Sequence, residues 1–201
     1  WTPAGAFVGD DDAQAASAAA ANAFDRRACE VVEVAGRPWF LHVLRAPDRL
    51  VIVGAVHIAA ALVRLARPMG FETIVIDPRE TLATVEQFGE DPDALVHAWP
   101  HEVMADLALD GDTYAVLLTH DPKIDDPALM ALIRSDVGYI GVLGGRSTHG
   151  ERRKRLVALG ATPEDLQRIH APIGLPIGAK TPEEIAVSIL AEMIQVKRAG
   201  A

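Results

Sequence analysis

One stretch decides the fold of this chain: residues 50–59, LVIVGAVHIA, which run from Leu50 to Ala59. Four apolar residues lead directly to Gly54, as in a central strand of a parallel sheet, where both faces are covered. From Ile58 to Met69 the apolar residues gather on one side of a predicted helix. The order strand, glycine turn and helix N-terminus predicts a phosphate site, because free N–H groups and the positive end of the helix dipole point above the turn.

The same turn departs from the dinucleotide-binding pattern G-x-G-x-x-G/A at one position. Gly54 and Ala59 fill the first and third positions, but Val56 stands where a glycine lets the backbone approach a pyrophosphate. The next predicted strand, residues 73–76, ends at Asp77, which lies 23 positions after Gly54. An acid there is typical of ribose binding, and equally of a turn that begins with aspartate. The pattern predicts the fold and indicates only weak binding of NAD(P).

The composition indicates an acidic globular protein. Hydrophobic residues make up 50% and charged residues 23% of the 201 positions, and the formal net charge of −9 argues against nucleic-acid binding. Cys29 is the single cysteine, so neither an intramolecular disulfide nor a multi-cysteine zinc site can form. The most apolar run, Leu50 to Val63, has 14 residues and is too short to span a bilayer. We expect a cytoplasmic protein without a membrane span.

Strands and helices alternate along most of the chain, which predicts a Rossmann-like, doubly wound parallel sheet of the α/β class. After Asp77 the pattern indicates a helix over 81–88, strands over 95–98, 113–118 and 137–143, and a final helix with an apolar stripe at Ile185, Ile189, Met193 and Val196. Before the first strand, residues 14–24 favour a helix, and residues 31–34 and 39–44 favour a β-hairpin. We therefore predict an N-terminal helix and hairpin extension over 1–48 and a Rossmann-like domain over 49–201.

Helix starts are predicted from capping residues and prolines. Asp126-Pro127 looks like an N-cap followed by proline at the first helical position, which leaves Asp121 and Lys123 without a capping role. The run 148–151 has the spacing of a capping box, so the basic run 152–155 is expected on a solvated helix face. The run Thr181-Pro182-Glu183-Glu184 predicts the start of the last helix.

Ligands of such sheets bind outside the carboxyl ends of the strands, so the turns there are expected to converge on one crevice. The candidate cofactor-binding residues in these turns are Gly54, Ala55, Val56, His57, Asp77, Arg79, Thr119, His120, Asp121, Lys123, Gly144, Gly145 and Arg146. The glycine turn and helix N-terminus offer donors to a phosphate, and the basic side chains complement an anion. No metal site is predicted, because Pro100 argues against a helix that would pair His97 with His101.

Six motifs resemble the Rossmann domain of the XdhC/CoxI family over roughly residues 49–197. They are GAVHIA at 54–59, IDPR at 76–79, LTHDPK at 118–123, YIG with LG at 139–141 and 143–144, HAPIGL at 170–175, and TPEEIA at 181–186. The family comprises accessory proteins for xanthine dehydrogenase and related molybdenum hydroxylases. The resemblance implies a homodimeric protein that binds the molybdenum cofactor (molybdopterin), presents it to a cysteine desulfurase for sulfuration, and hands it to the apo-molybdenum hydroxylase.

The chain departs from the family pattern at several places. It contains no GGC segment, and Pro176 stands where the family commonly has aspartate. We expect a cofactor-binding accessory protein for maturation of a xanthine-dehydrogenase-type enzyme, rather than a catalyst, and we assign no catalytic residue. Two alternatives remain open. One is an NAD(P)-dependent oxidoreductase with His120 as proton donor and Lys123 as anion clamp. The other is a scaffold that docks partner proteins without a bound cofactor.

Overall fold

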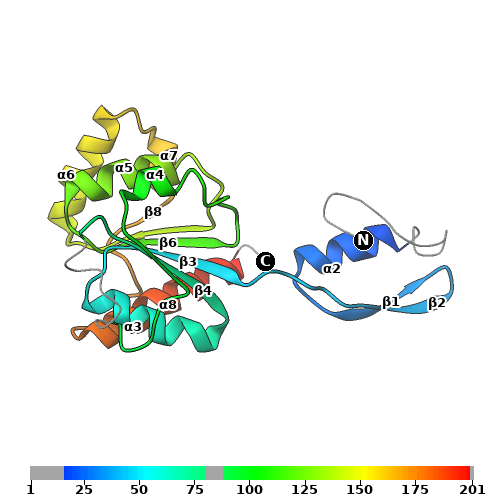
Figure 1. The fold of residues 1–201 in the computed structure, drawn as a ribbon. Helices are drawn as coiled ribbons and strands as arrows, with labels where there is room; N and C mark the ends of the chain where they lie inside the picture. Colours follow the sequence, from blue (N-terminus) through cyan, green and yellow to red (C-terminus); the bar gives the residue numbers. More distant parts are fainter. Residues whose placement is uncertain (1–15, 80–87, 200–201) are drawn as a thin grey trace. The chain divides into compact units, whose positions relative to one another are not determined.

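The structure, a computed structural model, describes residues 16–79 and 88–199, which form two compact units that divide between residues 46 and 47 (Figure 1). The predicted helix over 81–88 lies outside the described residues, apart from its last position. No helix in the described ranges is long and apolar enough to cross a membrane.

The N-terminal unit consists of a helix and a β-hairpin, as the sequence predicted. Helix α2 spans Ser17–Asp25, and strands β1 (Glu30–Val34) and β2 (Arg37–Leu41) pair antiparallel. Ala35 and Gly36 connect the strands, both with positive φ (51° and 76°), as in the type I′ turn that matches the twist of a hairpin. The cross-strand pair Val31 and Phe40 remains exposed, at 67% each.

The second unit is the predicted doubly wound parallel sheet. Its strands are β3 (Asp48–Val53), β4 (Phe71–Ile76), β5 (Ala94–Val96), β6 (Thr113–Leu117), β7 (Tyr139–Val142) and β8 (Ile169–His170). They lie in the order β5-β4-β3-β6-β7-β8, and all neighbours pair in parallel. This is the strand order of the Rossmann fold, and its switch point lies between β3 and β6.

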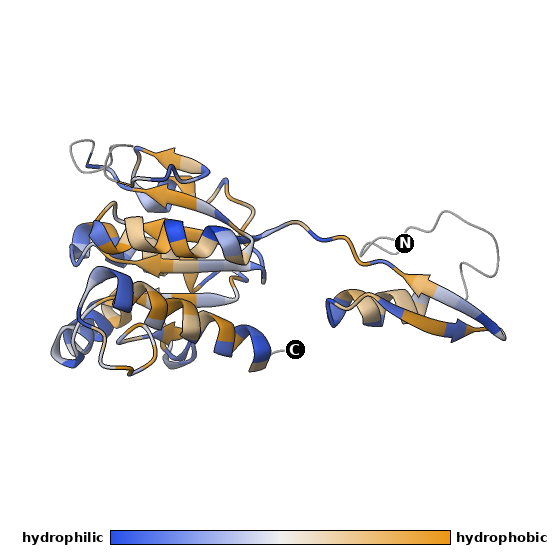
Figure 2. Ribbon diagram, turned by 90° about the horizontal axis from the view of Figure 1, so that it is seen from below, coloured by the Kyte–Doolittle hydropathy of each residue, from blue (hydrophilic) through white to orange (hydrophobic). Residues whose placement is uncertain are grey.

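Two helical layers cover this sheet (Figure 1). One contains α3 (His57–Ala66), the short η1 (Arg67–Met69) and α8 (Pro182–Ala199), and the other α4 (Pro100–Val103), α5 (Pro122–Leu132), α6 (Arg146–Ala158) and α7 (Pro163–Gln167). Alternate residues of β3 enter opposite cores, with Leu50 and Ile52 facing α3 and α8, and Val51 and Val53 facing α5. Figure 2, seen from the side of α3 and α8, shows the apolar strands behind these helices.

Helix α5 begins earlier than predicted. Asp121 is its N-cap, and the Asp121 carboxylate accepts a hydrogen bond from the backbone N–H of Lys123 at 2.9 Å. The predicted start at Asp126-Pro127 is therefore wrong: Asp126 is buried within α5, and Pro127 is an interior residue of the helix. Two Asp-Pro pairs lie five positions apart, and the second aspartate binds Arg155 instead of capping.

Helix α6 also begins before the predicted capping box. Its N-cap is Gly145, and no side chain caps it. His149, Arg152 and Leu156 form the buried face of the helix, since residues three and four apart share a face. The expectation of a solvated basic face is therefore wrong for Arg152, which is 3% exposed. Arg153 and Lys154 are exposed as expected, and Arg155 is partly exposed and binds Asp126.

Candidate functional site

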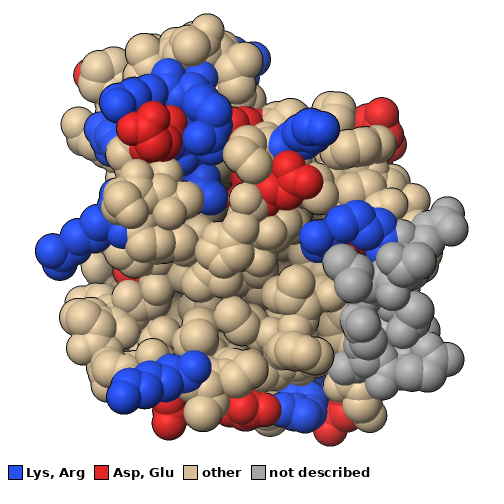
Figure 3. Space-filling model, turned by 90° about the vertical axis from the view of Figure 1, so that its left-hand side faces the viewer, with Lys and Arg blue, Asp and Glu red and all other residues tan. Residues whose placement is uncertain are grey.

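The turns that follow β3, β4, β6 and β7 come to one edge of the sheet, because these strands are parallel and adjacent. Figure 3 views this edge: uncharged side chains occupy its centre, and lysine, arginine and acidic side chains surround them. Gly54 and Thr119 follow the two strands that flank the switch point, where open α/β sheets bind ligands.

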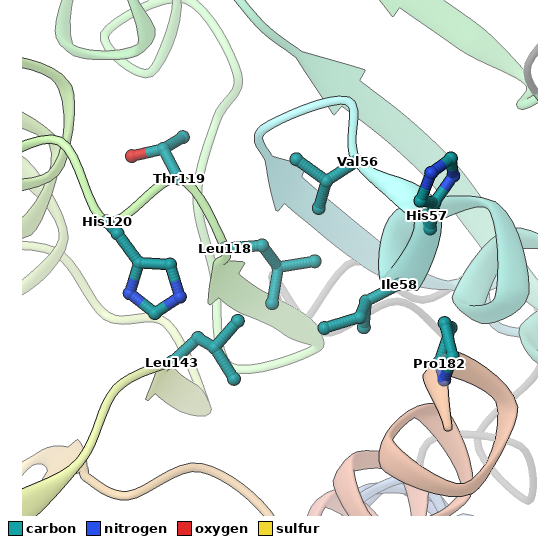
Figure 4. Close-up of a pocket in the computed structure, with 8 residues that line it drawn as sticks. All are labelled: Val56, His57, Ile58, Leu118, Thr119, His120, Leu143 and Pro182. Atoms are coloured by element: carbon teal, nitrogen blue, oxygen red, sulfur yellow. The ribbon is translucent and has the colours of Figure 1, made fainter. Parts of the chain in front are cut away.

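A cavity of about 330 Å³ lies at this switch point. Its lining residues are Val56, His57, Ile58, Leu118, Thr119, His120, Leu143 and Pro182. In Figure 4 the side chains of Ile58, Leu118 and Leu143 point toward one another, the His120 ring lies beside Leu143, and the His57 ring points away from them. The cavity is thus apolar, with the His120 imidazole at its side, and its volume lies within the range of small-molecule sites.

The N-terminus of α3 leaves backbone donors open beside this cavity. The first helical hydrogen bond is from Ala60 N–H to the Val56 carbonyl, at 3.2 Å, so the N–H groups of His57, Ile58 and Ala59 precede it. The N-cap is Val56, whose aliphatic side chain cannot accept a hydrogen bond. These N–H groups and the helix dipole can therefore receive an anion.

Gly54 is required by the geometry of this turn. Its φ is +106°, which side-chain-bearing residues rarely adopt, and a Cβ built on it would lie 2.7 Å from Cγ2 of Thr119. The glycine thus lets the end of β3 pass close to the end of β6 at the base of the cavity.

Asp77 is fully buried, and its interactions support a structural role. One carboxylate oxygen accepts from the N–H of Ala55 (2.8 Å) and from Nη2 of Arg79 (2.7 Å), and the other accepts from the N–H and Nε of Arg79. Burial opposes ionisation, but these hydrogen bonds outweigh it and lower the pKa of Asp77. All four acceptor positions of the carboxylate are filled, so none is open to a ribose hydroxyl.

The four predicted residues after β6 have different roles in the structure. The Thr119 hydroxyl donates to Asp125 at 2.5 Å and accepts from the N–H of Asp121, which itself caps α5. Lys123 is exposed and does not line the cavity. His120 lines it, and its φ of +62° is unusual for a residue other than glycine. Such backbone strain concentrates at functional sites, which favours His120 as the ligand-facing residue.

A buried polar network beneath the site was missed by the sequence reasoning. Arg152 donates through Nη2 to Asp125 (3.1 Å) and through Nη1 to Nδ1 of His149 (2.9 Å), while Nε2 of His149 lies 2.8 Å from the carbonyl oxygen of Gly144. Because Thr119 also binds Asp125, the network joins the turn after β6 to the turn after β7. It thereby fixes the two sides of the cavity relative to each other.

The protonation of this network follows from its geometry. A carbonyl oxygen only accepts, so Nε2 of His149 carries the hydrogen and Nδ1 accepts from Arg152. The ring is therefore neutral, and burial lowers its pKa, as do the charges of Arg152 and His120. Burial likewise raises the pKa of Asp125, although Thr119 and Arg152 donate to its carboxylate.

The remaining predicted residues lie at the start of α6. Gly144 has a φ of +141°, and Gly145 is the N-cap residue of α6, where no side chain caps the helix. Arg146 is exposed and forms no ion pair with the described residues. Arg146 does not line the cavity at the switch point but a neighbouring one. Within residues 16–79 and 88–199, no group of three or more histidine, cysteine or acidic side chains is placed to hold a metal ion.

Comparisons with known proteins show which family this chain resembles. The sequence model that defines the XdhC Rossmann domain family matches residues 50–193. The chain is 32% identical to YqeB of Escherichia coli (strain K12) over 79% of its length, and 34% identical, also over 79%, to a probable xanthine dehydrogenase subunit of Bacillus subtilis (strain 168). It is 36% identical to the "Molybdenum cofactor insertion chaperone PaoD" of Escherichia coli (strain K12) over 46% of its length.

A solved structure agrees with these sequence matches. A crystal structure described as a xanthine dehydrogenase from Bacillus halodurans superposes with a TM-score of 0.66 and 31% identity, and the match covers 81% of this chain and 45% of the other. The chain spans 29% of YqeB and of PaoD and 46% of the Bacillus subtilis protein. The matched range coincides with the parallel sheet and its helices, and the chain belongs to the XdhC Rossmann domain family.

Proposed function

We propose that this chain binds the molybdenum cofactor and acts as a chaperone for its insertion into a molybdenum hydroxylase. The observation that carries the proposal is the open N-terminus of α3, which lines the same apolar cavity as His120. Three backbone N–H groups and the helix dipole would hold the phosphate of the cofactor, and the apolar walls would contact its organic part. The name of PaoD, a similar protein, supports the same role.

The partners follow from this role as further parts of the proposal. An insertion chaperone must meet an apo-molybdenum hydroxylase, and the name of the Bacillus subtilis relative supports a xanthine-dehydrogenase-type enzyme. A cysteine desulfurase and a second copy of this chain are the other partners that we propose. We regard the protein as an accessory factor and not a catalyst, and the name of PaoD supports that class.

The proposal is tested by retention of the cofactor in a molybdenum-replete host. After purification, bound molybdenum is measured by elemental analysis, and bound pterin by the fluorescence of its oxidised product. Replacing His120→Ala should lower both by about tenfold or more, because a hydrogen bond to a charged group contributes roughly 1.5–3 kcal/mol. His101→Ala is the matched control, because His101 is also exposed but does not line the cavity. A wild-type protein without molybdenum or pterin would overturn the proposal.

A further inference from the structure

A second cavity, of about 440 Å³, adjoins the one at the switch point. The two share the side chain of Leu143 as a lining residue. The second cavity is also lined by the late loop, which we define as residues 172–179, together with Arg146 and residues Ile185 and Ser188 of α8. A ligand that occupies both cavities must therefore pass Leu143.

The late loop is fixed to its neighbours, so this cavity is preformed. The N–H of Ile173 donates to the Val142 carbonyl (3.2 Å), and the N–H of Leu175 donates to the Ser188 carbonyl (3.1 Å). Gly174 donates to the carboxylate of Glu192 at 2.8 Å, and a Cβ built on Gly174 would lie 2.4 Å from Oγ of Ser188. The loop thus packs tightly against both β7 and α8, despite its lack of regular structure.

The chemistry of the cavity suits a heterocycle that carries a carbonyl group. Leu143, Ile173 and Ile185 supply apolar contact surface, and Arg146 is the charged residue of the lining. The late-loop N–H groups of Gly178 and Ala179, two residues of the lining, form no hydrogen bond with the described residues, so their donor capacity is unfilled. Arginine donates to the O6 carbonyl of guanine, and a pterin presents the equivalent carbonyl, O4, as an acceptor.

We infer that the late-loop cavity binds the pterin ring of the cofactor, with Arg146 at the O4 carbonyl of the ring. This assignment rests on the proposed function, in which the phosphate end lies at the N-terminus of α3. The two ends of one ligand are thus bound by different parts of the fold: backbone donors at the switch point, and the late loop with α6 and α8. Leu143 lies where the two halves join.

Two fragments test the assignment separately. Hydroxymethylpterin, which carries the ring without a phosphate, is titrated by its own fluorescence, and glycerol phosphate is tested by its effect on thermal unfolding. Ala179→Phe, which fills the cavity, and Arg146→Gln should each weaken pterin binding by about tenfold or more and leave the effect of glycerol phosphate unchanged. Ala179→Ser and Arg153→Gln are the controls, since Arg153 is an exposed arginine two turns along α6.

The outcomes separate this inference from the proposed function. Unchanged pterin affinity in Ala179→Phe, or no saturable pterin binding to a wild-type protein that retains the intact cofactor, would overturn the late-loop assignment alone. A wild-type protein that retains no cofactor from the host, yet binds pterin in a manner sensitive to Arg146→Gln, would refute the proposed function and leave a pterin site in place.

Discussion

Replacing Arg152→Leu should cost far more stability than replacing any other arginine of α6. Arg152 and Asp125 form an ion pair in which the side chains are 4% and 1% exposed. Removing one partner of a buried pair leaves an uncompensated charge and costs roughly 3–5 kcal/mol. The loss also leaves Nδ1 of His149 without its donor. Because burial already raises the pKa of Asp125, uptake of a proton would relieve part of the cost, so we expect about 3 kcal/mol at neutral pH.

Arg155→Leu is the matched control for this prediction. It lies on the same helix and binds Asp126, but the Arg155 side chain is 38% exposed, so water screens the pair. Its loss leaves the buried Asp126 carboxylate without this donor and should cost roughly 1–2 kcal/mol. Urea denaturation followed by far-ultraviolet circular dichroism measures both free energies of unfolding. The double variant Asp125→Leu with Arg152→Leu should recover most of the loss, because an apolar pair can replace a buried ion pair. Equal losses for the two single arginine variants would refute the reasoning.

Three further predictions concern the same domain. The free energy of unfolding should fall as the pH drops below 6.5, the ordinary pKa of histidine. Just below this pH the unfolded chain binds a proton that folded His149 does not bind, because burial lowers its pKa. His149→Gln should therefore reduce the slope of melting temperature against pH. Calorimetry should detect weak or no NAD(P) binding, and a micromolar Kd for the wild type would contradict this. Val56→Gly should raise the affinity at most modestly, because the hydrogen bonds within the protein already fill the acceptor positions of the Asp77 carboxylate. Gly174→Ala should destabilise by roughly 1–3 kcal/mol, whereas Gly145→Ala, which has open space, should stay within about 0.5 kcal/mol by thermal unfolding.

The sheet was predictable from the sequence because its strands are short apolar runs separated by helical patterns. Residues 50–53 and 113–117 are buried along their whole length. Strands that are buried on both faces have a nearly continuous apolar sequence, whereas apolar and polar residues alternate in half-exposed strands. The parallel order then follows from the connections. Strand β8 was not predicted, because it has two residues, Ile169 and His170, and a segment that short carries no periodicity.

The helix starts were harder to predict because local capping rules fit more than one place. Asp121 and Asp126 both precede a proline, and the choice between them depends on Arg155, which lies 29 positions after Asp126. Similarly, the basic run 152–155 resembles a solvated face in sequence, and only the packing of α6 against α5 reveals that Arg152 is buried. Tertiary contacts of this kind leave no local pattern in a single sequence.

The same difficulty applies to the candidate site. Asp77 and Thr119 were predicted as ligand-binding residues from their place after strands, yet their polar atoms bind Arg79, Ala55 and Asp125 within the protein. Residues at the carboxyl edge of a parallel sheet must also hold the turns in place, so position alone cannot separate the two roles. A polar side chain there points to ligand binding only when its hydrogen-bonding capacity is unfilled. By that criterion His120 and Arg146 are the side chains of this edge to test first.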